Sequence, residues 1–319
     1  MTDPAVPELS ILLVADSHEM IRKVLRCYAN QSDPHRLEVV VATYAGAGIS
    51  ETLLRAEGFV HARVIDSGSG DLARAEARAV RAATASYVVF AQAHAYPRPG
   101  FVDAILAATK SERPTVIGPV MANANPRSAV SRAAMRINYG PWCGERRRGP
   151  AATVPGHNSA YRRDALLALG ENLEKVLTAG RRLQVELLDR GASLFLESRA
   201  CVEIANVSRP WWFCADMYRQ GRRFAAERGL GWSLARRLGY AAAAPLIPVV
   251  RFARILRDRT SSRSAEGGGP VELVAVLLGL IASAAGEMIG YVAGRSSRPD
   301  FDDTSFHRLR YVSDADRRA

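Results

Sequence analysis

Short apolar runs alternate with longer helical segments along the first part of the chain. Leu9–Val14 suits a buried strand, and Glu19–Asn30 then places its apolar residues at helical spacing. Further strand-like runs are Leu37–Ala42, His61–Ile65, Tyr87–Ala91 and Thr115–Met121, and further helical segments are Asp71–Ala85 and Phe101–Lys110. Strands that alternate with helices are typical of βαβ units. We therefore predict an α/β fold with a largely parallel sheet.

The next part of the chain continues the mixed pattern. Thr153–Ser159 and Ser193–Glu197 are strand-like, and Asp164–Leu169 and Arg181–Arg190 have helical spacing. Gly191 is well placed to end the second of these helices, because glycine accepts the left-handed conformation found there.

The character of the sequence changes after Trp211. Ala215–Arg228 is a basic helical segment, and Leu238–Leu256 is apolar but contains Pro245 and Pro248, so a helix there must be kinked or broken. We divide the chain into an α/β domain over 1–210, basic amphipathic or interfacial helices over 211–260, a Ser/Gly linker over 261–270, a hydrophobic membrane-associated helix over 271–294 and a charged, frayed tail over 295–319.

Leu273–Gly286 is the longest uncharged stretch of the chain. It is shorter than the ~20 apolar residues that span a bilayer. Extension to Ala293 admits Glu287, which costs roughly 3 kcal/mol near the bilayer centre. One membrane span and an interfacial or re-entrant hairpin both fit this segment.

The charge of the chain is +11, and its placement favours a membrane surface. Eleven arginines and three acidic residues lie between Ala205 and Arg259, where Trp211, Trp212 and Trp232 are interleaved with them. No nucleic-acid-binding module is recognisable, so we expect no nucleic-acid partner. The N-terminus does not resemble a signal peptide, which predicts the cytoplasmic side of the membrane. Four scattered cysteines without a CxxC pair indicate neither a zinc site nor a disulfide framework.

Residues Tyr87–Ala91 and the following Gln92–Phe101 resemble a segment of family 2 glycosyltransferases. In that family a strand ends in an acidic DxD motif, followed by a proline turn and an aromatic residue that opens a helix. Similar members carry Glu-Asp-His at the strand end, and His94 matches the third position. Gly118–Tyr139, Val154–Leu169 and Gly286–Gly294 are also similar to this subgroup. The resemblance implies a GT-A, Rossmann-like, mostly parallel sheet with helices on both faces.

The resemblance also implies a chemistry from which this chain departs. A divalent ion held by the acidic motif neutralises the leaving nucleoside diphosphate, and a carboxylate deprotonates the acceptor hydroxyl. Here Gln92 and Ala93 replace both acids, so we expect no tightly bound metal and at most a weak Mn²⁺ or Mg²⁺ site. Three further family positions lack their usual side chain, and they fall at Thr43, near Ala179-Gly180 and at Ile204.

The remaining polar residues form the candidate site. We predict that Gln92, His94 and Asn158 bind the donor, and that His94 or His157 is catalytic, since a neutral imidazole suits general-base work. A turn with hydrogen-bonding side chains is the alternative for residues 156–158. Gln220 and Arg223 resemble the QxxRW motif, and we predict that they bind the donor; a solvated helix face is the alternative.

These inferences predict a membrane-associated glycosyltransferase. It would transfer a sugar from a nucleotide-diphosphate donor to a lipid-linked or cell-envelope glycan acceptor at the cytoplasmic membrane face. The alternative is a catalytically silent GT-A-like protein that serves as a binding or scaffold protein at the membrane. The loss of acidic residues at Gln92 and Ala93 favours this alternative.

Overall fold

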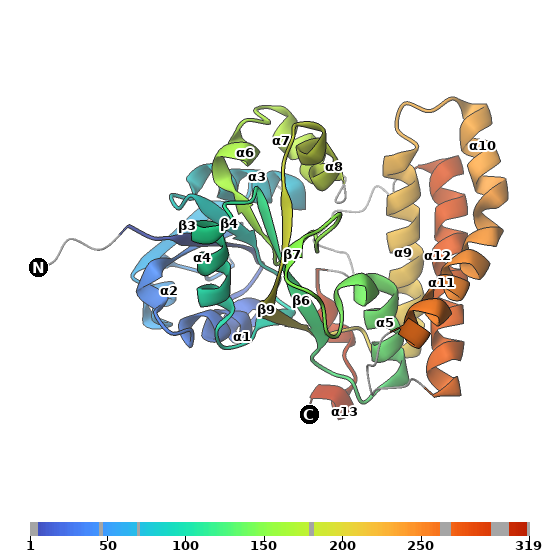
Figure 1. Cartoon of the computed structure of the whole chain (residues 1–319), viewed down its shortest axis with the longest axis horizontal. Coiled ribbons are helices and arrows are strands. Elements are labelled where there is room, and N and C mark those ends of the chain that lie inside the picture. Colours follow the sequence, from blue (N-terminus) through green and yellow to red (C-terminus); the bar gives the residue numbers. More distant parts are fainter. Residues whose placement is uncertain are drawn as a thin grey trace, which may run out of the picture. The chain divides into compact units, whose positions relative to one another are not determined.

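The chain folds into two compact units, shown in a computed structural model (Figure 1). The structure describes residues 6–44, 47–68, 71–178, 182–261, 269–294 and 306–317. One unit comprises Met1–Met121 with Arg146–Glu203, and we call it the sheet unit. The other comprises Ala122–Glu145 with Ile204–Ala319, and we call it the helical unit. The chain therefore passes between the units three times, and residues 122–145 group with the C-terminal helices.

Four parallel strands form one half of the sheet. They are β1 (Leu9–Val14), β2 (Leu37–Thr43), β3 (His61–Asp66) and β4 (Tyr87–Phe90), in the order β3-β2-β1-β4. Beside β4 lies the short β8 (Ala160–Arg162), which is antiparallel both to β4 and to β6 (Val116–Asn123). The sheet is completed by β5 (Ala95–Pro97), β7 (Gly149–Pro150) and β9 (Leu194–Ile204). The predicted α/β class is confirmed, with a sheet that is parallel in its first half and mixed beyond it.

Helices cover both sides of the parallel strands (Figure 1). The crossovers α1 (His18–Ala29) and α2 (Glu51–Ala56) lie on one side with α4 (Phe101–Ser111), whose Phe101 ring meets Tyr28 edge-on at 6.1 Å. Because β3 connects to β4 across β1 and β2, right-handed crossover places α3 (Leu72–Ala82) on the opposite side. The remaining helices of this unit are η1 (Pro34–Arg36), α6 (Arg163–Leu167), α7 (Asn172–Thr178) and α8 (Arg182–Asp189).

The helical unit is built around one long helix, α12 (Pro270–Ala293). It packs against α5 (Ala129–Tyr139), α9 (Pro210–Arg228), α10 (Leu234–Ala243) and α11 (Ile247–Ser261). Its core contains Ile137, Phe213, Met217, Val276 and Leu280. Shorter turns are η2 (Gly140–Trp142), η3 (Ala244–Leu246), η5 (Arg308–Tyr311) and α13 (Asp314–Arg317).

Helices α9 and α12 approach each other closely because glycine stands at their contacts. A Cβ atom at Gly221 would collide with the carbonyl oxygen of Ser283, and one at Gly286 with the carbonyl oxygen of Tyr218. At the start of α12, the fully buried Glu272 accepts hydrogen bonds of 2.8 Å from the Nε atoms of both Arg132 and Arg136. This ion pair ties α5 to α12 inside the helical unit.

Two sequence predictions for the second half of the chain differ from the structure, and a third is confirmed. Thr153–Ser159 is a loop and not a strand, because Asn158 adopts φ +62°; the strand begins at Ala160. The tail is ordered over 306–317, where Tyr311 packs on Trp212 with ring centroids 4.4 Å apart. The apolar segment around Pro245 is broken into two helices by η3, as its prolines predict. Residues 262–268 of the predicted linker lie outside the described residues.

Candidate functional site

The carboxyl ends of the parallel strands converge beside β1. From β1 the strand order runs to β2 and β3 on one side and to β4 on the other, so the order reverses between β1 and β4. Ligands of open α/β sheets bind outside the carboxyl ends at such a point. There the chain leaves β1 through Asp16 and Ser17, which directly precede α1, and leaves β4 through Gln92. This edge of the sheet unit is the candidate site.

Asn158 connects the loop before β8 to the end of β4. Its backbone N–H donates to the Phe90 carbonyl at 2.8 Å, and its Nδ2 donates to Oε1 of Gln92 at 3.2 Å. The residue is 1% exposed, and its Oδ1 has no hydrogen-bond partner among the described residues. The structure thus brings the predicted Gln92 and Asn158 together and leaves Oδ1 of Asn158 buried with no partner among the described residues.

The same loop carries His157, which faces a carboxylate. Its Nε2 lies 3.4 Å from Oε1 of Glu76, a residue of α3 that is 9% exposed. A carboxylate at this nitrogen favours the tautomer with its proton on Nε2, which leaves Nδ1 able to accept a proton. The His157 side chain is 39% exposed, so that nitrogen can be reached from solvent. Glu76 was not predicted, because a glutamate within an Ala/Arg-rich helix has the pattern of a solvated face.

Hydrogen bonds to the backbone hold this loop in place. The Tyr161 hydroxyl donates to the Gly156 carbonyl at 2.7 Å, and burial raises the pKa of Tyr161, so the hydroxyl stays protonated. The Ser159 hydroxyl donates to the Pro155 carbonyl at 2.6 Å, and the Gln184 amide donates to the Val154 carbonyl at 2.8 Å. His157 and Asn158 are therefore presented by a fixed backbone.

The next strand pair contributes a second polar position. Thr43 and Asp66 are opposite each other at the ends of β2 and β3. Thr43 is buried, and its hydroxyl has no hydrogen-bond partner among the described residues. Asp66 accepts from Gly68 N–H at 2.9 Å, and its backbone carbonyl accepts from Arg78 at 2.9 Å. An exposed carboxylate thus lies on β3 opposite Thr43, and it was not predicted because the register of the two strands was not known from the sequence.

His94 and its neighbour Ala93 are buried at the end of β4, with exposures of 3% and 5%. Among the described residues there is no group of three or more His, Cys, Asp or Glu side chains that could hold a metal ion. The family positions near Ala179-Gly180 lie outside the described residues. Ile204 is fully buried at the end of β9 and has no polar side chain.

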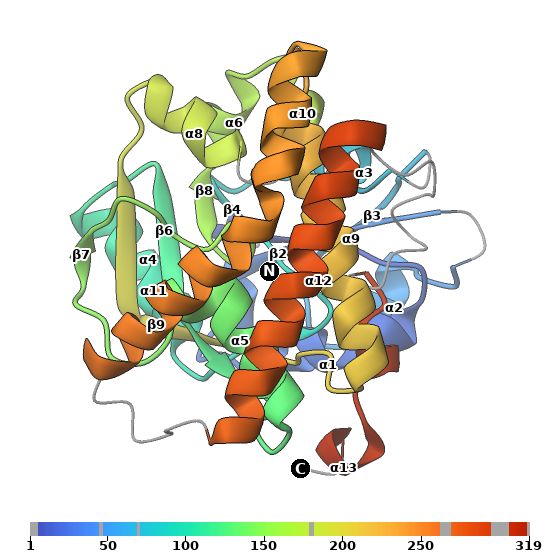
Figure 2. The same cartoon turned by 90° about the vertical axis from the view of Figure 1, so that its right-hand side faces the viewer.

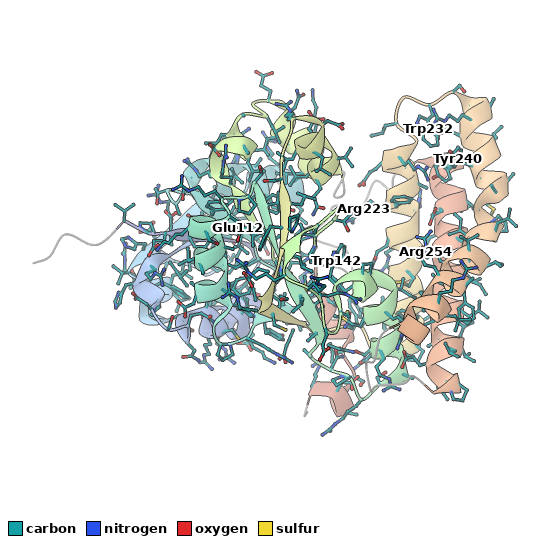
Figure 3. The ribbon with its side chains drawn as sticks, in the orientation of Figure 1. Glu112, Trp142, Arg223, Trp232, Tyr240 and Arg254 are labelled. Atoms are coloured by element: carbon teal, nitrogen blue, oxygen red, sulfur yellow. The ribbon has the colours of Figure 1, made fainter. Side chains whose placement is uncertain are left out.

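Gln220 and Arg223 belong to the helical unit, whereas the other predicted residues belong to the sheet unit. Both lie on α9, three residues apart, and Figure 3 labels Arg223. Gln220 donates to Oδ2 of Asp216 at 2.8 Å, one turn earlier in the helix. The adjacent Arg222 donates to the Gly294 carbonyl at 3.1 Å, so it caps the end of α12.

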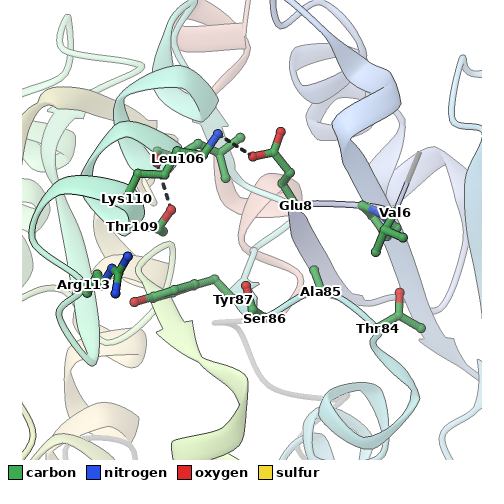
Figure 4. Close-up of a pocket in the computed structure, with 11 residues that line it drawn as sticks. Val6, Glu8, Thr84, Ala85, Ser86, Tyr87, Leu106, Thr109, Lys110 and Arg113 are labelled. Atoms are coloured by element: carbon green, nitrogen blue, oxygen red, sulfur yellow. Dashed lines mark hydrogen bonds and ion pairs between the residues drawn. The ribbon is translucent and has the colours of Figure 1, made fainter.

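A pocket of about 620 Å³ opens elsewhere on the sheet unit (Figure 4). It lies at the amino ends of β1 and β4, next to Glu8, Tyr87 and Arg113, and Lys110 forms a 2.8 Å ion pair with Glu8 there. Ligand crevices of parallel sheets lie at the opposite, carboxyl ends. This pocket is therefore separate from the candidate site.

No protein-family model matches the chain, and no curated protein matches it by sequence. Among solved structures, it is similar to GalNAc-T7 with UDP, GalNAc and Mn²⁺ at 12% identity and a TM-score of 0.49, covering 64% of this chain and 44% of that one. It is also similar to S. aureus TarS 1–349 in complex with UDP, at 14% identity and a TM-score of 0.46, covering 96% of this chain and 100% of that one. A mycobacterial protein is 19% identical with a TM-score of 0.46, and the match covers 70% of this chain and 74% of that one.

The chain spans about half the length of the first two structures that it matches, 44% of GalNAc-T7 and 52% of a longer TarS chain.

Proposed function

We propose that the protein is a glycosyltransferase that binds a nucleotide-diphosphate sugar at the carboxyl ends of β1 and β4. The observation that supports this most is the connected polar group Gln92, Asn158, His157 and Glu76, which stands where open α/β sheets bind nucleotides. Asn158 Oδ1 and Thr43 Oγ1 are buried acceptors without a partner among the described residues, and buried polar groups of this kind are normally satisfied by a ligand or water.

His157 is the proposed general base. As the acceptor oxygen bonds to the anomeric carbon, His157 Nδ1 takes the hydroxyl proton, and the bond from that carbon to the diphosphate oxygen breaks. Glu76 keeps the imidazole oriented and stabilises the imidazolium that forms. Gln92, His94 and Asn158 are the proposed donor-binding residues, and His94 is the second catalytic candidate, as a buried donor to the leaving diphosphate.

The leaving diphosphate needs cationic or hydrogen-bonding stabilisation, and Gln92 and Ala93 supply no carboxylate for a metal. An imidazole and an amide oxygen make a poor Mg²⁺ site and suit Mn²⁺ better, so we propose at most a weakly held divalent ion. Gln220 and Arg223 remain proposed donor-binding residues, because a guanidinium matches phosphate oxygens bidentately.

The proposed acceptor is a lipid-linked or cell-envelope glycan at the cytoplasmic membrane face. Two helical segments, Leu234–Arg257 and Pro270–Ala293, are long and apolar enough to cross a membrane, and arginines accompany the first of them. Such a surface brings an enzyme close to acceptors that are anchored in lipid.

Isothermal titration with UDP and with GDP, each with and without Mn²⁺, tests donor binding. Turnover across a panel of nucleotide sugars then tests transfer, with His157→Ala expected to lower kcat by roughly 100-fold or more while leaving UDP affinity unchanged. His61→Ala, a change to a half-buried histidine at the amino end of β3, is the matched control. Unchanged turnover in the His157 variant would exclude it as the base.

One observation favours a second function, a catalytically silent binding protein of the same fold. Both positions of the acidic motif are non-acidic here, at Gln92 and Ala93. UDP binding without turnover of any nucleotide sugar would support this alternative, and absence of nucleotide binding at millimolar concentration would remove the transferase proposal.

A further inference from the structure

The helical unit exposes an unusually apolar helical segment. From Leu234 to Arg257 the chain forms α10, η3 and α11, and only 17% of the most apolar stretch is buried. Leu246, Val249 and Val250 are 66%, 68% and 58% exposed, and Leu234 is 64% exposed. Helices of soluble domains normally bury their apolar stripe. Several large aliphatic side chains gathered on one segment therefore indicate a binding surface.

Helix α12 adds a second exposed stripe beside this segment. Its exposed apolar residues are spaced so that they lie along one side of the helix: Val271, Val274, Leu277, Leu278, Ile281, Met288 and Val292. Both α10 and α11 pack against α12, and the three helices lie side by side in Figure 2. We call these exposed aliphatic residues of α10, η3, α11 and α12 the apolar face.

The charge around the apolar face is mainly positive, and the acidic Glu287 of α12 is buried near Arg251. Residues 229–257 contain five arginines and neither aspartate nor glutamate. At the start of the segment, the Arg236 guanidinium lies 4.0 Å from the Trp232 ring, and that ring lies 4.7 Å from Tyr240 (Figure 3). Aliphatic residues bordered by arginine, tryptophan and tyrosine are the composition of helices that lie in a lipid interface.

We propose that the apolar face docks onto an anionic lipid bilayer, with α10 and α11 lying in the plane of its surface. The cations attract acidic headgroups, and the aliphatic side chains enter the acyl boundary. A second copy of the chain is a poorer occupant, because a two-fold contact would bring together two segments that each carry five arginines and no acidic residue over 229–257. Docking deepens the membrane location given in the proposed function and does not depend on sugar transfer.

The packing of α12 favours binding at the membrane surface over a position in which α12 spans the membrane. The side of α12 opposite its exposed stripe is held against α9 by the close contacts at Gly286 and Gly221. Helix α9 carries Arg219, Arg222 and Arg223, and each charge would cost roughly 3 kcal/mol at the bilayer centre. Insertion of α12 alone would also separate Glu272 from its two arginines.

Vesicle flotation of the full chain tests the proposal. We expect the chain to float with vesicles of phosphatidylcholine and phosphatidylglycerol, and more weakly with phosphatidylcholine alone. The double variant Val249→Glu, Val250→Glu should lose flotation at an unchanged Tm, because both side chains are already exposed. The matched control is Val60→Glu, Val185→Glu, which adds the same charge at exposed valines of the sheet unit and should float normally.

Two further measurements distinguish docking on the bilayer surface from a membrane-spanning helix and from a dimer contact. Arg254→Gln should weaken binding to anionic vesicles about five-fold and leave binding to neutral vesicles unchanged. Alkaline carbonate should release the chain from membranes, as it does proteins that do not span them. The proposal is overturned by failure of the full chain to float, by normal flotation of the Val249/Val250 variant, by resistance to carbonate, or by a dimer that this variant alone disrupts.

Discussion

Asn158 serves the candidate site through both its side chain and its backbone. Its φ of +62° turns the loop so that its amide meets Gln92 and its N–H meets the Phe90 carbonyl. Asparagine accepts this left-handed conformation better than most residues, and alanine loses about 1–2 kcal/mol in it. The left-handed turn of the loop and the amide that contacts Gln92 thus both depend on Asn158.

Replacing Asn158 by glycine and by alanine separates these two contributions. Asn158→Gly keeps the backbone conformation and removes the amide, whereas Asn158→Ala also adds strain. We expect Asn158→Ala to be about 1 kcal/mol less stable than Asn158→Gly in urea denaturation, and both to weaken UDP binding equally. Equal stability of the two variants would contradict the left-handed turn.

Glu197 makes a pH-dependent contribution in the sheet unit. Burial alone would raise its pKa, but hydrogen bonds from Arg199 and Arg148 outweigh it and lower the pKa to about 2. Because the folded pKa lies below the unfolded value of about 4.3, the stabilisation is present above that value. It is lost as the pH falls from about 4.3 towards about 2.

Glu197→Gln should therefore lower the free energy of unfolding by roughly 1–3 kcal/mol at pH 7 and by about half as much at pH 3, where the folded carboxyl is still mostly ionised. Denaturant titrations at both pH values measure the difference. Glu19→Gln is the control, because the exposed Glu19–Arg22 pair should contribute less than about 1 kcal/mol. A variant that loses as much stability at pH 3 as at pH 7 would show that the charge of Glu197 is not the cause.

At the scale of single elements, strong periodicity made the first strands and helices predictable. β1 matches the predicted bounds, and β2, β3, β4, α1 and α4 end within a residue or two of theirs. The failures have local causes. A backbone turn at Asn158 ends the predicted strand of 153–159, and α5 was not predicted because its apolar face is made mostly of alanine and serine, a weak hydrophobic signal.

The candidate site was predictable only where its residues share one segment. Gln92 and His94 follow a clear strand, and His157 and Asn158 stand next to each other. Glu76 contacts His157 from a helix some eighty residues earlier in the chain, and no sequence periodicity reports such a pairing. The role of the conformation at Asn158 was likewise visible only in the backbone.

The α9–α12 contact gives a prediction about helix packing. Gly286→Ala places a methyl group against the Tyr218 carbonyl, so the helices must separate, at a cost of about 1–3 kcal/mol. Gly239→Ala, on the exposed α10, meets no atom within 4 Å and should instead stabilise the protein by roughly 0.5–1 kcal/mol. Thermal denaturation distinguishes the two; a harmless Gly286→Ala would mean that the helices are further apart.

For the whole molecule, the main consequence of the fold is that its compact units do not follow the order of the chain. Helix α5 precedes β8 in sequence, yet its Ala133, Ala134 and Ile137 belong to the core of the helical unit. A chain cut after the last strand would keep α5 but lose α9 and α12, which cover it. Removing the C-terminal helices is therefore not a neutral way to test membrane attachment.

A chain ending at Arg209 should accordingly expose the apolar side of α5, bind a hydrophobic dye and aggregate. The substitution Ile137→Lys tests this, because it should improve the behaviour of the short chain and destabilise the full chain. In the short chain the side chain faces water, so lysine should reduce dye binding and aggregation. In the full chain Ile137 is 9% exposed beside Phe213, so the same change should destabilise the protein by several kcal/mol. Dye fluorescence, light scattering and thermal denaturation of the four proteins measure this; a substitution with the same effect in both chains would show that α5 is not covered by the C-terminal helices.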